Sequence, residues 1–141
     1  MSGVNVLEAV VEILERWGWV QHAAVAAGGF DIVGAFEEST GVPLRNLAAD
    51  EDAVISAFVE PSCDAALRAL AHLIGPDPVD GPIPDERWAW VHVITQFNDR
   101  SGQAWPVVRR TLHEARDLVA RAERDGRPPT SPTKSQPPPL P

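Results

Sequence analysis

The sequence predicts an all-α fold: a single compact domain of five or six helices followed by a disordered, proline-rich C-terminal tail. Apolar residues recur every three or four positions in several segments, which places them on one face of a helix. Glycine, proline and acidic residues stand where these segments begin and end, and no strong partner strand for a sheet is visible. We expect the domain over residues 1–125 and the tail over residues 126–141.

The first expected helix covers residues 4–17 and ends at Gly18. Its glutamates fall on one side and its apolar residues on the other. The apolar residues are Val4, Leu7, Val10, Val11, Leu14 and Trp17. Residues 19–27 are short, small and partly alternating, so they fit either a brief strand or a loop, and we favour the loop.

Three more helices are expected before the middle loop. Asp31 lies near the positive end of the first of them, and Gly41 provides its stop. Acidic residues form the first turn of the next helix, and Pro61 separates it from the one that follows. The three helices cover residues 30–40, 50–59 and 62–74.

The second half begins with a loop at residues 75–86, where four prolines and two glycines exclude regular structure. Residues 87–97 fit a strand or a helix, and the Pro84-Asp85-Glu86 start signal favours a helix with Trp88, Val91, Ile94 and Thr95 on one face. The last helix, at residues 105–124, is the clearest element, and Gly126 ends it. Its apolar face consists of Val108, Leu112, Ala115, Val119 and Ala122.

Composition excludes several classes of function. The chain has 141 residues and a formal net charge of −8, so nucleic acid and anionic membrane surfaces would repel it. No stretch approaches the roughly 18 apolar residues of a membrane span, and the N-terminal segment has no basic region of the kind that secretory signals carry. We expect a soluble, cytoplasmic protein that binds neither nucleic acid nor membranes.

The sharpest enzyme hypothesis is a cysteine-dependent hydrolase. Cys63, the only cysteine, lies at an expected helix N-terminus, and His92 and Asn98 follow in the order of a papain-like base and orienting residue. A cysteine among alanines and leucines is more often a small core residue, and the local signature of such a site is missing. We therefore expect no catalytic residues and keep this hydrolase as an alternative.

Metal and cofactor binding are also not expected. No histidine lies four residues from another on one helix, and the lone cysteine excludes a multi-cysteine zinc site. Gly28-Gly29 lacks the lysine of a phosphate-binding loop. The five tryptophans are expected to anchor the core or its rim, although some could line a groove. They are Trp17, Trp19, Trp88, Trp90 and Trp105.

A polar segment, Asn98-Asp99-Arg100, separates the last two helices and could be a site or a turn. We favour a turn in which the side chains of Asn98 and Asp99 bond their own backbone, with Phe97 as a core anchor and Pro106 in the first turn of the last helix. A second polar motif could meet this segment in space. The candidate ligand- or partner-binding residues are therefore Trp19, Gln21, Asn98, Asp99 and Arg100.

Four short motifs resemble those of a known family: Gly18-Trp19-Val20-Gln21, Gly34-Ala35-Phe36, Phe97-Asn98-Asp99 with Gly102, and Val108 at the head of a long helix. In this order they resemble a domain of unknown function in small proteins of actinobacteria and their phages, over about residues 4–122. The resemblance implies a fold and a host range, and it implies no activity.

The chain departs from the family pattern in three places. The family's cysteine falls at residues 31–32, where this chain has none, and Phe97 stands for its tryptophan. Ala104 stands where the pattern has a threonine that caps the last helix. We expect the cap to shift to Asp99 or Ser101.

These observations predict a non-enzymatic protein-binding or regulatory module with a protein partner. In a phage it could serve host takeover, defence or counter-defence, which rests on the resemblance alone. The alternative is a small-molecule pocket or hydrolase that uses Trp19, Gln21, Asn98 and Asp99, with Cys63. Side chains of Asn98 and Asp99 that point into a cavity lined by Trp19 and Gln21 would favour this alternative.

Overall fold

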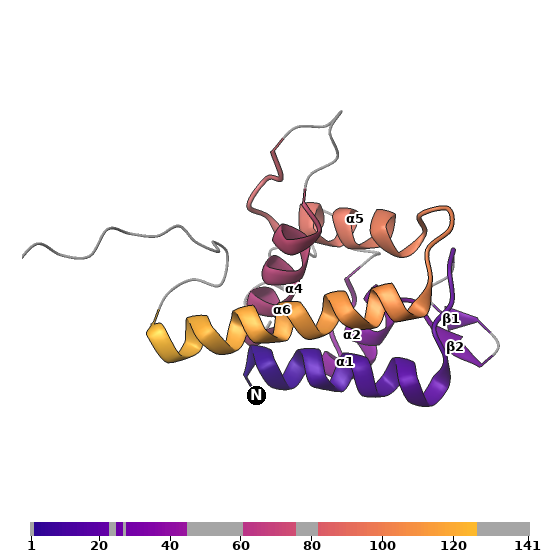
Figure 1. The fold of residues 1–141 in the computed structure, drawn as a ribbon, viewed down its shortest axis with the longest axis horizontal. Helices are drawn as coiled ribbons and strands as arrows, with labels where there is room; N and C mark the ends of the chain where they lie inside the picture. Colours follow the sequence, from indigo (N-terminus) through magenta and orange to yellow (C-terminus); the bar gives the residue numbers. More distant parts are fainter. Residues whose placement is uncertain (1, 23–24, 27, 45–60, 76–81, 127–141) are drawn as a thin grey trace, which may run out of the picture.

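Five helices and two short strands make up the described part of the chain in a computed structural model (Figure 1). The structure describes residues 2–22, 25–26, 28–44, 61–75 and 82–126. The helices are α1 (Gly3–Trp17), α2 (Ile32–Thr40), α4 (Pro61–Ile74), α5 (Arg87–Asn98) and α6 (Trp105–Asp125). The strands are β1 (Val25–Ala26) and β2 (Gly29–Phe30). The expected all-α class is confirmed.

α1 and α4 each pack against three other helices: α1 contacts α2, α4 and α6, and α4 contacts α1, α5 and α6. α1 and α6 run antiparallel side by side along the molecule, and α5 lies on the other side of α4 (Figure 1). α2 contacts α1 and α5. The core receives fully buried side chains from all five helices, each worth about 1.5–3 kcal/mol when a large aliphatic or aromatic group is buried. Examples are Leu7, Phe36, Leu67, Ile94 and Leu112.

Local capping explains where the first two helices begin. The Ser2 hydroxyl accepts a hydrogen bond from the Asn5 amide at 3.1 Å, and the Asp31 carboxylate accepts one from the Gly34 amide at 2.6 Å. Asp31 therefore caps α2 directly, in addition to the favourable dipole position expected of it. Gly41 has a φ of 75° and stops α2 as expected.

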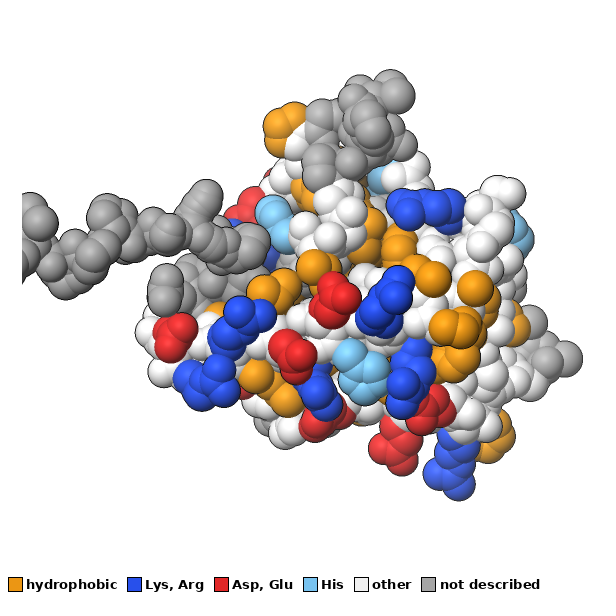
Figure 2. All heavy atoms as spheres, in the orientation of Figure 1, with side chains coloured by type: hydrophobic (Ala, Val, Ile, Leu, Met, Phe, Trp, Pro, Cys, Tyr) orange, Lys and Arg blue, Asp and Glu red, His pale blue; other side chains and the backbone are white. Residues whose placement is uncertain are grey.

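The last helix agrees with its expected pattern. Its buried residues are Val108, Leu112, Ala115, Val119 and Ala122. Pro106 lies in the first turn, and Gly126 closes the helix in a left-handed conformation. Acidic and basic side chains mix along the outer face of α6 and α1 (Figure 2). None of the described helices combines the length and apolarity needed to cross a membrane.

Residues 19–27, where the sequence favours a loop, include the short strand β1. β1 and β2 pair antiparallel, and the backbone of Phe30 also pairs with the segment after α1. Gly29 permits this contact, because a Cβ there would lie 2.7 Å from Val20 Cγ1 and 2.9 Å from the Gly18 carbonyl oxygen. Sequence spacing did not favour the pairing, because strands of two residues are too short for partial alternation to distinguish them from a loop.

Two tryptophans expected to face inward are exposed. Trp17 is 53% exposed at the end of α1, where the helix passes the edge of the core. Trp88 is 61% exposed, because the buried face of α5 is centred on Trp90, Ile94 and Phe97. At 3.6 residues per turn, position 88 lies about 200° from position 90 around the helix axis.

Three expected features lie outside the described residues: the helix at residues 50–59, residues 76–81 of the middle loop, and the tail from residue 127 onward. Residues 82–86 of the loop contain neither helix nor strand, as expected.

Candidate functional site

The two polar motifs singled out in the sequence meet at the side chain of Asn98, which is fully buried at the end of α5. Asn98 Oδ1 accepts hydrogen bonds from Trp19 Nε1 at 2.7 Å and from the Ile32 amide at 3.0 Å. Its Nδ2 donates to the Val20 carbonyl at 3.1 Å and to Asp99 Oδ1 at 2.9 Å. The amide thus makes the four hydrogen bonds that it can make.

Gln21 and Asp99 complete this arrangement, which we call the Asn98 junction. Gln21 Nε2 donates to the carbonyl oxygen of Asn98, the last residue of α5, at 3.1 Å and to that of Arg100, just beyond the helix, at 3.0 Å. Asp99 Oδ1 accepts from the amide of His22 at 2.7 Å, and His22 has a φ of 63°. The junction therefore binds the segment after α1 to the end of α5.

The bonding expected within the 98–100 turn is wrong. The side chains of Asn98 and Asp99 bond mainly the segment after α1, because that segment packs against the end of α5 and supplies donors and an acceptor. Among the described residues they do not bond the first amides of α6, and the Asn98 amide is occupied by Trp19, Val20, Ile32 and Asp99. The ligand- or partner-binding role of Trp19, Gln21, Asn98, Asp99 and Arg100 stays a prediction.

The cap expected at Asp99 or Ser101 is also wrong. α6 begins after Ala104, which has no side-chain oxygen to bond the first amides. Gln103 lies at this turn instead: its Oε1 accepts from the Ala104 amide at 3.2 Å, and its Nε2 donates to the Phe97 carbonyl at 2.8 Å. Gln103 thus joins the end of α5 to the start of α6.

Cys63, His92 and Asn98, the three residues of the hydrolase alternative, do not form an exposed site together. Cys63 is 1% exposed within the core, whereas His92 lies on the outer side of α5. Asn98 is held by Trp19 and the other partners of its junction. A thiolate nucleophile needs access to substrate and a histidine within hydrogen-bond reach, so this geometry does not support the hydrolase.

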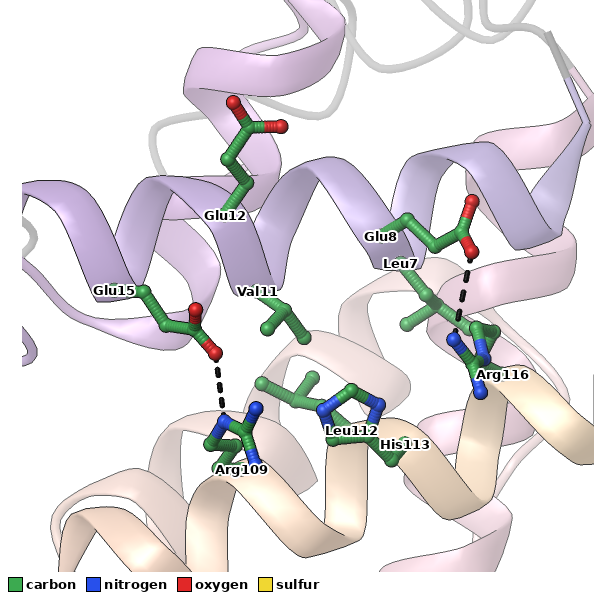
Figure 3. A pocket seen from close by; sticks show the side chains of 9 residues that line it. All are labelled: Leu7, Glu8, Val11, Glu12, Glu15, Arg109, Leu112, His113 and Arg116. Carbon is green, nitrogen blue, oxygen red and sulfur yellow. Dashed lines mark hydrogen bonds and ion pairs between the residues drawn. The ribbon is translucent and has the colours of Figure 1, made fainter.

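A groove of about 290 Å³ lies between α1 and α6 (Figure 3). Two ion pairs cross it: Glu15 Oε1 lies 2.6 Å from Arg109 Nε, and Glu8 Oε2 lies 3.4 Å from Arg116 Nη1. Between the ion pairs lie the apolar side chains Leu7, Val11 and Leu112. Because both arginines already have carboxylate partners, the groove offers a ligand little unpaired positive charge.

The described histidines lie on separate elements: His72 on α4, His92 on α5, His113 on α6 and His22 after α1. In the described ranges, no three His, Cys, Asp or Glu side chains come together as metal ligands would. The Nε2 atom of His113 is buried beside the groove, and no described group bonds it.

Two double contacts between charged groups tie the start of α5 to α4. Arg87 Nε and Nη2 lie 2.9 and 3.1 Å from the two oxygens of Asp64. Arg68 Nε lies 2.8 Å from Asp85 Oδ1, and its Nη2 donates to Asp85 Oδ2 at 3.0 Å. The Arg87–Asp64 pair has the fork geometry that arginine favours with carboxylates, whereas Arg68 donates a hydrogen bond to Asp85 through Nη2 and its Nε donates none within the described chain. Both ion pairs join the start of α5 to α4.

His72 lies close to this ion-pair cluster on α4. Burial lowers the pKa of His72 below its usual value of 6.5, and the Arg68 guanidinium lowers this pKa further, while Asp85 acts in the opposite direction. Its Nε2 is buried without a hydrogen-bond partner among the described residues. The neutral imidazole is therefore the form that this environment favours.

Sequence reasoning missed the outward side chain of Trp88. Its indole N–H donates to the carboxylate of Glu86, the residue directly before α5. Trp88, His92 and Gln96 are all exposed and are spaced four residues apart, so they lie along one outer face of α5. The spacing was visible in the sequence, but it could not be told apart from a buried face because α5 is apolar on most sides.

No curated protein and no solved structure matches this chain significantly. A family of unknown function, DUF6197, matches residues 2–118, which include the Asn98 junction and the whole of α5. The match assigns no activity, and the actinobacterial or phage origin stays a prediction. Since the matched region covers most of the sequence, the chain belongs to this family of unknown function.

Proposed function

We propose that this chain is a small, non-enzymatic protein-binding module and that the outer face of α5 is its contact surface. The observation that carries the proposal is Trp88, a large apolar side chain that remains 61% exposed. An exposed indole adds little to the stability of the isolated chain, whereas tryptophan is enriched among the residues that dominate binding energy at interfaces.

The outer face of α5 also has the composition of an interface core. Between Arg87 and Asp99 the helix contains no charged residue, in a chain with a formal net charge of −8. Interface cores are depleted in charged residues. The outer face of α6, where acidic and basic side chains alternate (Figure 2), has the composition of a solvated surface.

The structure holds this face rigidly at both ends. Asp64 and Asp85 form ion pairs at its beginning, and the Asn98 junction fixes its last turn. A rigid surface loses less conformational entropy when a partner binds. In this proposal Trp19, Gln21, Asn98 and Asp99 support the surface from within, and exposed Arg100 borders it.

The sequence resemblance extends the proposal. On the host range that the resemblance implies, we propose that the module acts in the cytoplasm of an actinobacterium, or of such a cell infected by a phage, where a protein-binding chain would regulate a host or phage protein. An affinity-capture experiment tests whether this surface binds a protein. Immobilised wild-type chain is incubated with a lysate of the source organism, and retained proteins are identified by mass spectrometry.

We expect a partner that the wild-type chain and a Trp17→Ala variant retain and that a Trp88→Ala variant loses. Trp17→Ala is the matched control, because both variants remove a tryptophan that is more than half exposed. Circular dichroism checks that both fold. Recovery of the same proteins by all three chains, or of none, would refute α5 as the contact surface.

A further inference from the structure

The two exposed tryptophans differ in what covers them. The guanidinium carbon of Arg16 lies 5.6 Å from the ring centroid of Trp17, so a cation from the same chain already occupies that indole. At Trp88 no cation of the described chain lies over the ring, and 61% of the side chain is exposed. Trp88 therefore presents an aromatic face that is open to a cation from outside.

A carboxylate that has no cationic partner among the described residues stands beside this face. Glu86 occupies the N-cap position of α5, yet its side chain bonds the indole N–H of Trp88 instead of a backbone amide of the helix. Among the described residues no Lys, Arg or His forms an ion pair with it. The pair therefore combines a negative charge with an aromatic face, two features that attract cations.

The neighbouring charges do not cancel this carboxylate. Asp85 is paired with Arg68, and Arg87 is paired with Asp64, so these four charges balance one another. The positive end of the α5 dipole amounts to about half a charge, which is less than the full charge of Glu86. A negative potential remains at Trp88, and the net charge of −8 adds to it at longer range.

We infer that the partner bound at Trp88 is a basic protein segment, with an arginine or lysine side chain that stacks on the indole and pairs with Glu86. This inference rests on the proposed function and names the chemistry of its partner. Tryptophan is the strongest aromatic acceptor for a cation, and the planar guanidinium of arginine stacks on it while its N–H groups reach a carboxylate.

The test uses a hexa-arginine peptide and the full chain labelled with ¹⁵N. Single Trp→Phe variants assign the five indole N–H signals, and the peptide is titrated at low salt. We expect the Trp88 signal to move most, and a hexa-glutamate peptide to leave it unchanged. Trp88→Ala should raise the Kd about two- to five-fold, and Glu86→Gln about two- to three-fold.

Matched controls separate a local site from the general field of an acidic chain. Trp17→Ala removes the other exposed indole, and Glu12→Gln removes one exposed carboxylate that points away from Arg109 and Arg116 in Figure 3. Both variants should bind the hexa-arginine peptide with the Kd of the wild-type chain, within experimental error. Equal weakening by Glu12→Gln and Glu86→Gln, or a larger shift of the Trp17 signal, would overturn the inference.

The outcomes also distinguish the inference from the proposed function. A protein captured through Trp88, together with a hexa-arginine peptide that does not recognise this indole, would overturn the basic partner and leave the contact surface intact. Loss of Trp88 dependence in both experiments would overturn both.

Discussion

The Asn98 junction and the α1–α6 groove both join segments that are far apart in the sequence, and they do so with opposite chemistry. The junction is centred on a fully buried neutral amide, which bonds an indole, two backbone groups and the carboxylate of Asp99. The groove uses charged side chains that are about half exposed, since Arg109 is 50% and Glu15 is 44% exposed. The two regions thus separate buried hydrogen bonding from surface ion pairing within one domain.

The difference shows where polar side chains determine this fold. A buried donor or acceptor that loses its partner costs about 1–3 kcal/mol, because water cannot replace the bond. An exposed ion pair contributes about 0–1 kcal/mol, because water screens it and two long side chains must be ordered. The junction should therefore hold the end of α5 in place, whereas the ion pairs of the groove should add little to stability.

The largest expected effect is that of Asn98→Ala. The substitution leaves the Trp19 indole N–H, the Ile32 amide and the Val20 carbonyl without their partner, and we expect a loss of about 3 kcal/mol in the free energy of unfolding. Urea unfolding measures this loss. Trp19→Phe removes one donor and should cost about 1 kcal/mol; equal costs for the two variants would argue against a shared network.

A smaller effect is expected from Gly29→Ala, which disturbs the backbone contact beside the junction. Its Cβ would lie 2.7 Å from Val20 Cγ1 and 2.9 Å from the Gly18 carbonyl oxygen, so the segment must shift. We expect a loss of about 2 kcal/mol, as for overpacked sites. Gly28→Ala is the control, because no atom lies within 4 Å of its Cβ and only its φ of 85° is strained. Thermal unfolding should rank Gly29→Ala as the more damaging.

Sequence spacing predicted the parts of the molecule where apolar residues recur at helical spacing within one segment. The buried face of α6 was predicted residue by residue, since one helix with a clear apolar face contains all the information needed. The buried face of α5 was predicted only in part, because the helix is apolar on most sides. Nothing in the neighbouring sequence distinguishes its exposed tryptophan from a buried one.

The junction needed information that local spacing does not contain. Its residues were named as two polar motifs that could meet, but the bonds that join the end of α5 to the earlier segments connect positions 66 to 79 residues apart. Two of the four groups that Asn98 bonds, at Ile32 and Val20, belong to the backbone, which every residue type shares. A single sequence therefore indicates the polar side chains and leaves their partners open.

The pH dependence of stability should show the cost of burying a polar group that lacks a partner. Because the pKa of His72 is lowered in the folded chain, the unfolded chain binds the proton more tightly. The free energy of unfolding therefore keeps the full contribution of His72 above pH 6.5. That contribution falls as the pH drops from 6.5 to the pKa that His72 has in the folded chain. His72→Gln should reduce this slope in urea unfolding between pH 7 and 5; an unchanged slope would contradict the assignment.

The smallest effect is expected at the groove. A double-mutant cycle on Glu15→Gln and Arg109→Gln isolates the coupling between the two side chains, whose atoms lie 2.6 Å apart. We expect a coupling below about 1 kcal/mol that falls further at high salt, because both groups are about half exposed. A coupling as large as the loss in Asn98→Ala would mean that the groove shares in fixing the fold, and the contrast between the two regions would no longer hold.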